Sequence, residues 1–221
     1  MSECTHPAPD VPLSGAVPAG AGLPAVVRIP VPGTNGLAVE LWPRGHVPKT
    51  GSTSTVFIQN LQGNRHLRLD YGFNKATQTF EWHWNQKGTH AQFGVGNHQS
   101  AGRAAGVAGE VARHYRYAGR ALVVVGVALD AVSIVTASRP LRRTAQVVSA
   151  WTGAVLGCKG GGAAGAGIGA FFAGAGAAPG GIAGCAVGGF LGYLGGERVG
   201  GYLYDWAEGT VFTPLREVRA P

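Results

Sequence analysis

The stretch that decides the fold runs from Gly153 to Gly201 and reads GAVLGCKGGGAAGAGIGAFFAGAGAAPGGIAGCAVGGFLGYLGGERVGG. It contains no charged residue between Lys159 and Glu197. Small residues recur at every fourth position, first before Pro179 and again after it. The two series are Gly153, Gly157, Gly161, Gly165, Gly169, Ala173 and Ala177, then Gly180, Gly184, Gly188, Gly192, Gly196 and Gly200. Because positions four apart share one face of an α-helix, each series predicts a helix with a face free of side chains.

Such faces are costly in water, where each helical glycine destabilises a helix by about 1 kcal/mol relative to alanine. In lipid they allow two helix backbones to pack closely. The arms 160–178 and 180–196 would be about 28 and 26 Å long. A turn at Pro179-Gly180-Gly181 would bring Lys159 and Glu197 to the same membrane interface. We therefore predict a glycine-zipper helical hairpin that enters a bilayer, with a tightly packed soluble helical domain as the alternative.

The overall composition also favours an anionic partner, either lipid headgroups or nucleic acid. The 221 residues carry a formal charge of +7, and 45% are hydrophobic whereas only 13% are charged. The three cysteines, Cys4, Cys158 and Cys185, have no metal-site spacing. Cys158 and Cys185 could pair in an oxidising compartment, but two buried free thiols are the favoured interpretation. We expect no cofactor and no metal, and no signal peptide is visible.

Four regions follow from the changes in composition. Residues 1–52 are rich in proline and indicate a linker or N-terminal arm, with short edge strands at Val26–Val31 and Leu37–Leu41. Residues 53–98 predict an antiparallel β domain, residues 101–206 a helical membrane-active domain, and residues 207–221 a tail. The fold class is therefore α+β, a small antiparallel β-meander followed by a helical bundle with a glycine-zipper hairpin.

The β domain is predicted from three short alternating segments, Thr55–Gln59, Arg65–Tyr71 and Thr79–Asn85, which turn sequences separate. One face would be apolar and the other polar. The apolar face would carry Val56, Ile58, Leu67, Leu69, Tyr71, Phe80, Trp82 and Trp84. The polar face would carry His66, Arg68, Asp70, Glu81 and His83, which could act as a metal-independent nuclease site. An ordinary solvated sheet face with cross-strand charge pairs predicts the same alternation.

Two further helices are predicted at Ala101–Tyr117 and Ala121–Ser138. Asp130 lies within the second, otherwise apolar helix. A carboxylate within a membrane span usually marks function, so Asp130 is a pore-lining candidate. The alternative is that it pairs with Arg116, Arg120 or Arg139 in a soluble packing. The basic residues expected to dock on lipid headgroups are Arg113, Arg116, Arg120, Arg139, Arg142 and Arg143. An aromatic belt at the interface would comprise Tyr193, Tyr202, Tyr204 and Trp206.

The order of Thr55–Gln59, Arg65–Gly72, Trp82–Gly88 and a zipper ending in Gly201–Trp206 resembles the C-terminal toxin regions of polymorphic toxins and type VI secretion effectors. This resemblance implies a secreted antibacterial toxin with a cognate immunity protein, acting at the inner membrane of a target cell. It also implies that the N-terminal arm joins a secretion apparatus or carrier protein. No catalytic residue is carried over from it.

We expect a toxin that forms ion-conducting pores as a homo-oligomer in anionic membrane lipids. One alternative is a nuclease whose zipper serves translocation, and the other is a non-enzymatic structural or adaptor domain.

Overall fold

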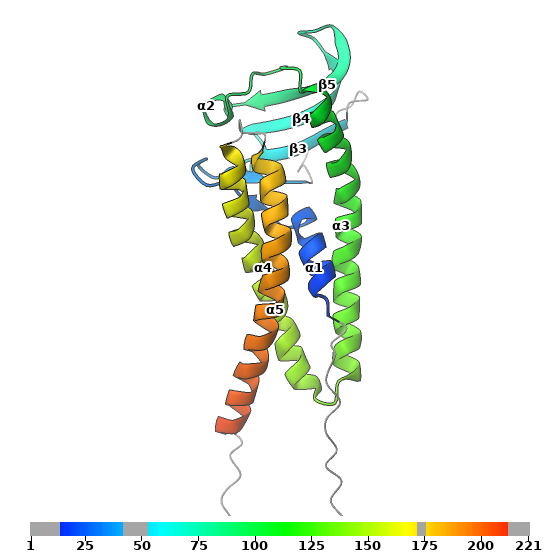
Figure 1. Cartoon of the computed structure of the whole chain (residues 1–221), viewed down its shortest axis with the longest axis vertical. Helices are drawn as coiled ribbons and strands as arrows, with labels where there is room; N and C mark the ends of the chain where they lie inside the picture. The colour runs from blue at the N-terminus through cyan, green and yellow to red at the C-terminus, as the bar shows by residue number, and fades with distance from the viewer. Residues whose placement is uncertain (1–13, 42–52, 172–175, 212–221) are drawn as a thin grey trace, which may run out of the picture.

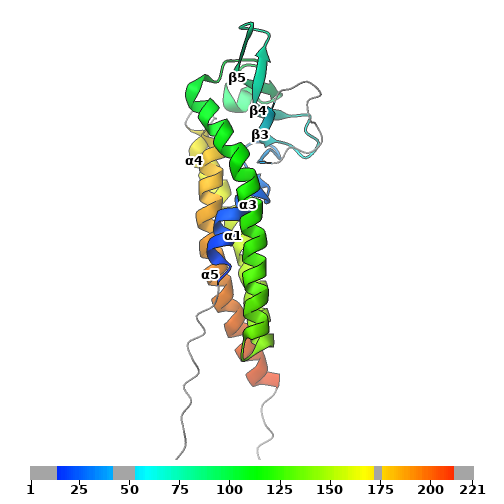
Figure 2. The same cartoon turned by 90° about the vertical axis from the view of Figure 1, so that its right-hand side faces the viewer.

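The computed structural model describes residues 14–41, 53–171 and 176–211. Three long helices form an elongated bundle, and a small antiparallel sheet lies at one end of it (Figure 1). The helices are α3 (Gly102–Thr136), α4 (Pro140–Ala170) and α5 (Ala177–Val211). Figure 2 shows, from the side, that α3 runs from the sheet along most of the bundle and that α5 extends beyond its lower end. The predicted α+β class, with a meander followed by a helical hairpin, is confirmed.

The sheet contains five strands in chain order, and every neighbouring pair is antiparallel. β3 (Thr53–Gln59), β4 (His66–Asn74) and β5 (Thr79–Lys87) are the three predicted strands. β1 (Ile29–Pro30) and β2 (Ala38–Val39) extend the sheet beyond β3. A bulge shifts the register within β3, so that Val56 pairs with Arg68 whereas Ile58 pairs with Leu67. Val56 therefore lies on the side of Arg68, and the single apolar face predicted for Val56 and Ile58 was wrong.

Residues 14–41 belong to the packed core rather than to a linker. They form α1 (Ala16–Gly22), a short 3₁₀ helix η1 (Leu23–Ala25), β1 and β2. Apolar side chains from this segment, including Leu23, Leu37 and Val39, are buried with those of the sheet and the hairpin. The linker interpretation of residues 1–52 thus fails for 14–41. Residues 1–13 and 42–52 lie outside the described residues.

The two helices predicted before residue 140 are one continuous helix, α3, because Ala118 and Arg120 favour helix and no proline interrupts them. α3 ends where Ala137 turns to an extended conformation, with ψ of 141°. Pro140 then opens α4 at its first position, where a missing N–H is tolerated. A single turn of helix, α2 (His90–Phe93), follows β5.

The turn of the zipper hairpin lies between Ala170 and Ala177, so the predicted turn at Pro179–Gly181 was wrong. Pro179 instead occupies the first turn of α5, where helical N–H groups lack partners and proline is tolerated. Consequently Lys159 and Glu197 do not meet. Glu197 pairs with Arg143, which precedes Lys159 on α4 by about 24 Å of helix. Of the predicted tail, 207–221, the first five residues continue α5, and 212–221 lie outside the described part.

Candidate functional site

The predicted glycine faces of α4 and α5 pack directly on each other along the hairpin. A Cβ atom added to Gly157 would lie 2.0 Å from the carbonyl oxygen of Gly188, and one added to Gly184 would lie 2.1 Å from that of Gly161. No side chain fits at either distance, so glycine is required by the contact itself. The facing pairs are Gly153–Gly192, Gly157–Gly188, Gly161–Gly184, Gly165–Gly180 and Gly169–Gly176.

The series extends to the lower end of the hairpin, where Gly196 packs on the Ser149 carbonyl and Gly200 on Ala145. The predicted series lacks Gly176 because it restarts at Gly180, after the predicted turn; in the structure Gly176 faces Gly169. Ala177 is fully buried, and Ala173 lies outside the described residues.

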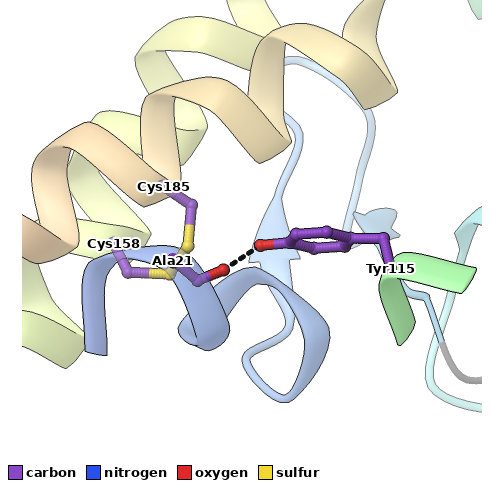
Figure 3. Close-up of a disulfide and its surroundings, with 4 residues drawn as sticks. All are labelled: Ala21, Tyr115, Cys158 and Cys185. Carbon is purple, nitrogen blue, oxygen red and sulfur yellow. Dashed lines mark hydrogen bonds between the residues drawn. A yellow bond between two sulfur atoms is a disulfide. The ribbon is translucent and has the colours of Figure 1, made fainter. Parts of the chain in front are cut away.

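A disulfide between Cys158 and Cys185 crosses the same interface, and both residues are fully buried. Figure 3 shows its sulfur atoms beside Ala21 of α1, whose carbonyl accepts a hydrogen bond from the Tyr115 hydroxyl. The favoured interpretation of two free thiols was therefore wrong. The cysteines pair because close backbone packing brings their Cα atoms to 3.7 Å.

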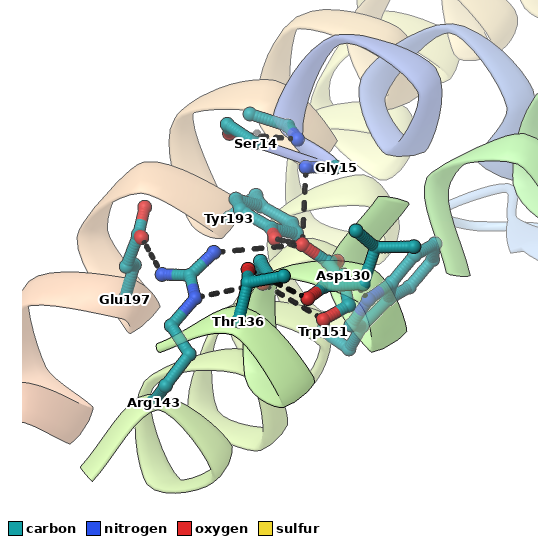
Figure 4. Close-up of polar contacts among 11 residues, drawn as sticks. Ser14, Gly15, Asp130, Thr136, Arg143, Trp151, Tyr193 and Glu197 are labelled. Carbon is teal, nitrogen blue, oxygen red and sulfur yellow. Dashed lines mark hydrogen bonds and ion pairs between the residues drawn. The ribbon is translucent and has the colours of Figure 1, made fainter. Parts of the chain in front are cut away.

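The carboxylate of Asp130 lies inside the bundle, only 1% exposed, and four groups surround it (Figure 4). The Tyr193 hydroxyl lies 2.7 Å from both of its oxygens, and the Trp151 indole N–H donates to Oδ2 at 2.8 Å. The backbone N–H of Gly15 donates to Oδ1 at 3.2 Å. Nη2 of Arg143 lies 3.6 Å from Oδ1. The ion-pair partner of Asp130 is thus Arg143, not Arg116, Arg120 or Arg139.

Arg143 connects this carboxylate to a second one. It is 7% exposed, and its Nη1 pairs with Glu197 of α5. Its Nε donates to the Ser133 hydroxyl at 2.9 Å, which in turn donates to the Asp130 carbonyl at 2.7 Å. Arg143 is therefore an interior residue rather than a headgroup-docking one. Each of the three long helices contributes one charge to this buried polar cluster, which we define as Asp130, Ser133, Arg143, Trp151, Tyr193 and Glu197.

The outer surface of the bundle is apolar, in contrast to its interior. Val135 is 83% exposed. Of an apolar 18-residue stretch of α3, only 17% is buried inside the structure. Within the described residues, α3 and α5 are long and apolar enough to cross a membrane, by length and composition. Other exposed apolar side chains on this surface include Val124, Val125, Val127, Val132, Val148, Leu156, Val187, Leu191, Val199 and Leu203.

Charged side chains bound this apolar surface at two levels. Gly126 of α3 packs against Trp151 of α4, and this contact aligns the two antiparallel helices. Along the helix axes, Arg120 and Lys159 then lie about 9 and 12 Å to the sheet side of the contact. On the other side, Arg139, the residue just before α4, and Arg142 lie about 18 and 14 Å away along α4. Lys159 and Arg142 are therefore separated by about 26 Å along α4, and Arg120 and Arg139 by about 27 Å across the two aligned helices.

At the level farther from the sheet, basic residues of α4 pair with acidic residues of α5. Both Nε and Nη2 of Arg142 donate to the Asp205 carboxylate at 2.8 Å, and Arg139 pairs with Glu208. Exposed aromatic side chains, Tyr202 and Trp206, flank the same level of α5. Of the residues predicted for an aromatic belt, Tyr202 and Trp206 are exposed and Tyr204 is half-buried, so for these the belt stays a prediction. Tyr193 is fully buried in the polar cluster, and its place in the belt was wrong.

The remaining predicted docking residues lie nearer the sheet. Arg113 pairs with Glu110 on its own helix at 3.0 Å. Arg116 donates to the hydroxyl of Tyr117 at 2.8 Å, and Arg120 is exposed at the boundary of the apolar surface.

The polar sheet face does not bring its two predicted catalytic histidines together. His66 pairs with Lys87 across the sheet, whereas His83 pairs with Asp70. These rungs are four residues apart, or about 13 Å along the strands. Both imidazoles are buried, with exposed fractions of 9% for His66 and 6% for His83. The ring that contacts His83, with centroids 5.6 Å apart, is His98, which the predicted site omitted.

Burial and the neighbouring Arg68 guanidinium lower the pKa of His66 below its ordinary value of 6.5. On the same face, Arg68 Nη2 lies 4.0 Å from Asp70. Glu81 accepts hydrogen bonds from Ser100 at 2.7 Å and Asn74 at 2.8 Å, and these contacts lower its pKa.

No protein-family model, curated protein or solved structure matches the chain. Across residues 14–41, 53–171 and 176–211, no three His, Cys, Asp or Glu side chains are grouped so that they could hold a metal ion. The candidate site therefore rests on the geometry of the bundle. Sequence reasoning missed Ser133, Trp151 and the backbone of Gly15, and the only available signal was that polar side chains interrupt otherwise apolar helices.

Proposed function

We propose that the protein inserts its α3–α5 bundle into a lipid bilayer and permeabilises it, as a secreted antibacterial toxin acting on a target-cell inner membrane. The observation that carries the proposal is the polarity of the bundle. Between its two charged levels the ion pairs lie inside, with Asp130 and Arg143 almost fully buried, while valine and leucine side chains cover the outside. In lipid, charged groups face the bundle interior and pair with one another, whereas a water-soluble bundle has the reverse arrangement.

The position of the charges supports a specific depth of insertion. Arg120 and Lys159 would lie at one headgroup level and Arg139 and Arg142 at the other, separated by about 26–27 Å. This distance is close to the thickness of the hydrocarbon core, about 30 Å. Exposed tyrosine and tryptophan side chains at the second level are typical of a membrane interface.

One exposed charge, Arg198, falls between the two levels. Gly196 packs beside Ser149 and Ala150, so Arg198 lies about 8 Å along the axis from the level of Arg142. A long arginine side chain can extend its guanidinium over such a distance to the headgroups while its stem stays in the apolar region.

The rival nuclease interpretation lacks comparable support, because His66 and His83 are about 13 Å apart and buried. A structural or adaptor role is supported by the rigid zipper, but it gives no reason for so many exposed valines on α3. Under the toxin proposal, a cognate immunity protein, a carrier or secretion apparatus and further copies of the chain are the expected partners.

The proposal is tested by flotation and dye release with vesicles that contain phosphatidylglycerol. The purified chain should float with the vesicles and release the dye. Gly184→Val should abolish release, because its Cβ would lie 2.1 Å from the Gly161 carbonyl oxygen. Gly195→Val is the matched control on the same helix, since no atom lies within 4 Å of its added Cβ, and it should release dye like the wild type.

A wild-type chain that remains in the aqueous phase at every lipid concentration would refute membrane insertion. Degraded nucleic acid in poisoned cells, sensitive to His66→Ala and His83→Ala, would favour the nuclease instead.

A further inference from the structure

The short N-terminal helix α1 fills the space between α3 and α5 (Figure 1). Two of its three alanines, Ala16 and Ala19, are almost fully buried. A Cβ on Gly20 would lie 2.7 Å from Cβ of Phe190 on α5. One on Gly22 would lie 2.5 Å from the Gly119 carbonyl oxygen on α3. The segment therefore contacts both helices closely enough that only glycine fits at these positions.

α1 also reaches the buried polar cluster. The N–H of Gly15, immediately before α1, donates to Asp130, as Figure 4 shows. At its other end, the Ala21 carbonyl accepts the hydrogen bond of Tyr115. Apart from these two hydrogen bonds, the side chains that face α3 and α5 are mostly small. α1 has only 7 residues, whereas α4 and α5 have 31 and 35 and are joined by a disulfide, so α1 is held more weakly than the zipper helices.

We propose that α1 is a plug, whose displacement opens a path between α3 and α5 beside the polar cluster. This inference rests on the proposed membrane activity. Without α1, the space beside Gly20 and Gly22 would be lined by Phe190, Val123 and the glycine backbone of α3. At the Gly15 end it would be lined by the Asp130 carboxylate, with the Trp151 indole and the Tyr193 hydroxyl that bind it. Those groups supply hydrogen-bond partners for water and ions, whereas the zipper leaves no room for either.

The first test locks α1 in place with a disulfide in a chain carrying Cys4→Ser. A Cβ on Gly126 would lie 3.2 Å from Cβ of Pro18, close to the range of about 3.5–4.5 Å found in disulfides. The tether is therefore Pro18→Cys with Gly126→Cys. The control tether is Phe73→Cys with Phe80→Cys, a directly opposed pair on β4 and β5.

The oxidised tether at α1 should slow dye release from phosphatidylglycerol vesicles by at least about tenfold, since the released state becomes a minor population. The control tether should leave release unchanged. Equal release from the α1 tether and the wild type would overturn the plug.

The second test displaces α1 with Gly22→Val. Gly22 has φ of −92°, which any L residue tolerates, so the effect of the valine is steric. This variant should release dye at least several-fold faster than the wild type at equal vesicle binding. Gly160→Val, with no atom within 4 Å of the added Cβ, is the control. If circular dichroism shows that Gly22→Val does not fold, the comparison of dye release between the α1 tether and the control tether tests the plug instead.

Flotation separates the two proposals. If no chain binds vesicles, both membrane insertion and the plug fail. If the wild type binds but releases no dye, release by Gly22→Val supports the plug, and its absence overturns the plug while insertion stands. If the wild type releases dye and neither the tether nor Gly22→Val changes the rate, only the plug is refuted.

Discussion

Replacing Gly188 by alanine tests whether the zipper is closed as tightly as its geometry indicates. The new methyl group would lie 2.2 Å from the carbonyl oxygen of Gly157, whereas an ordinary contact begins at 3.4 Å. Because the obstacle is backbone on a disulfide-linked helix, it cannot rotate away like a side chain. The two helices would have to separate locally by about 1 Å, and contacts at neighbouring glycine pairs would weaken.

The expected loss follows from two opposing effects. Overpacking a close-packed interface costs about 1–3 kcal/mol, and a rigid backbone obstacle places Gly188→Ala at the upper end. Alanine recovers about 1 kcal/mol of helix propensity. The net loss in the free energy of unfolding is thus about 2 kcal/mol, which lowers Tm by about 4–8 °C in a chain of this size.

Gly195→Ala gives the matched control because it lies on the same helix with no atom within 4 Å of its added Cβ. This variant gains only the helix propensity, so its Tm should rise by about 2–4 °C. Thermal unfolding by circular dichroism, with all chains in the same detergent, measures both shifts. The reasoning is refuted if both alanines raise Tm equally, since the glycines of the zipper would then make no contact that requires them.

Three further predictions concern the buried groups. Asp130→Asn removes the charge that faces Arg143 and should lower the free energy of unfolding by about 3 kcal/mol in denaturant titrations; an unchanged midpoint would contradict the ion pair. Replacing both Cys158 and Cys185 by serine opens a loop with a sequence separation of 27 residues and should cost about 3–4 kcal/mol, measured the same way. If the free energy of unfolding is unchanged in this variant, the disulfide does not stabilise the fold by restricting the unfolded chain. Because the pKa of His66 is lowered in the folded protein, the unfolded chain binds a proton first as the pH falls. Stability should therefore hold above about pH 6.5 and decline below it by up to about 1.4 kcal/mol per pH unit, and His66→Gln should reduce this slope.

The sheet histidines show why an alternating sequence pattern alone does not predict a site. Alternation placed His66 and His83 on one polar face, but alternation does not give strand register. The observed register sets them four rungs apart and pairs His83 with Asp70 instead. The bulge between Val56 and Ile58 likewise has no signal in the alternating pattern, and it moved Val56 to the side of Arg68.

The sequence by itself determined the two zipper helices, their bare faces and the three central strands. These features repeat every two or four residues, and neighbours along the chain determine them through local geometry. Only the tertiary structure decided where the hairpin turns, because a glycine-rich run permits a turn at several places and Pro179 is tolerated in the first turn of α5. It also decided that Arg143 is the partner of Asp130 and that α1 lies between α3 and α5. Such contacts join segments up to 115 residues apart, and close packing of the whole chain selects them rather than any local preference.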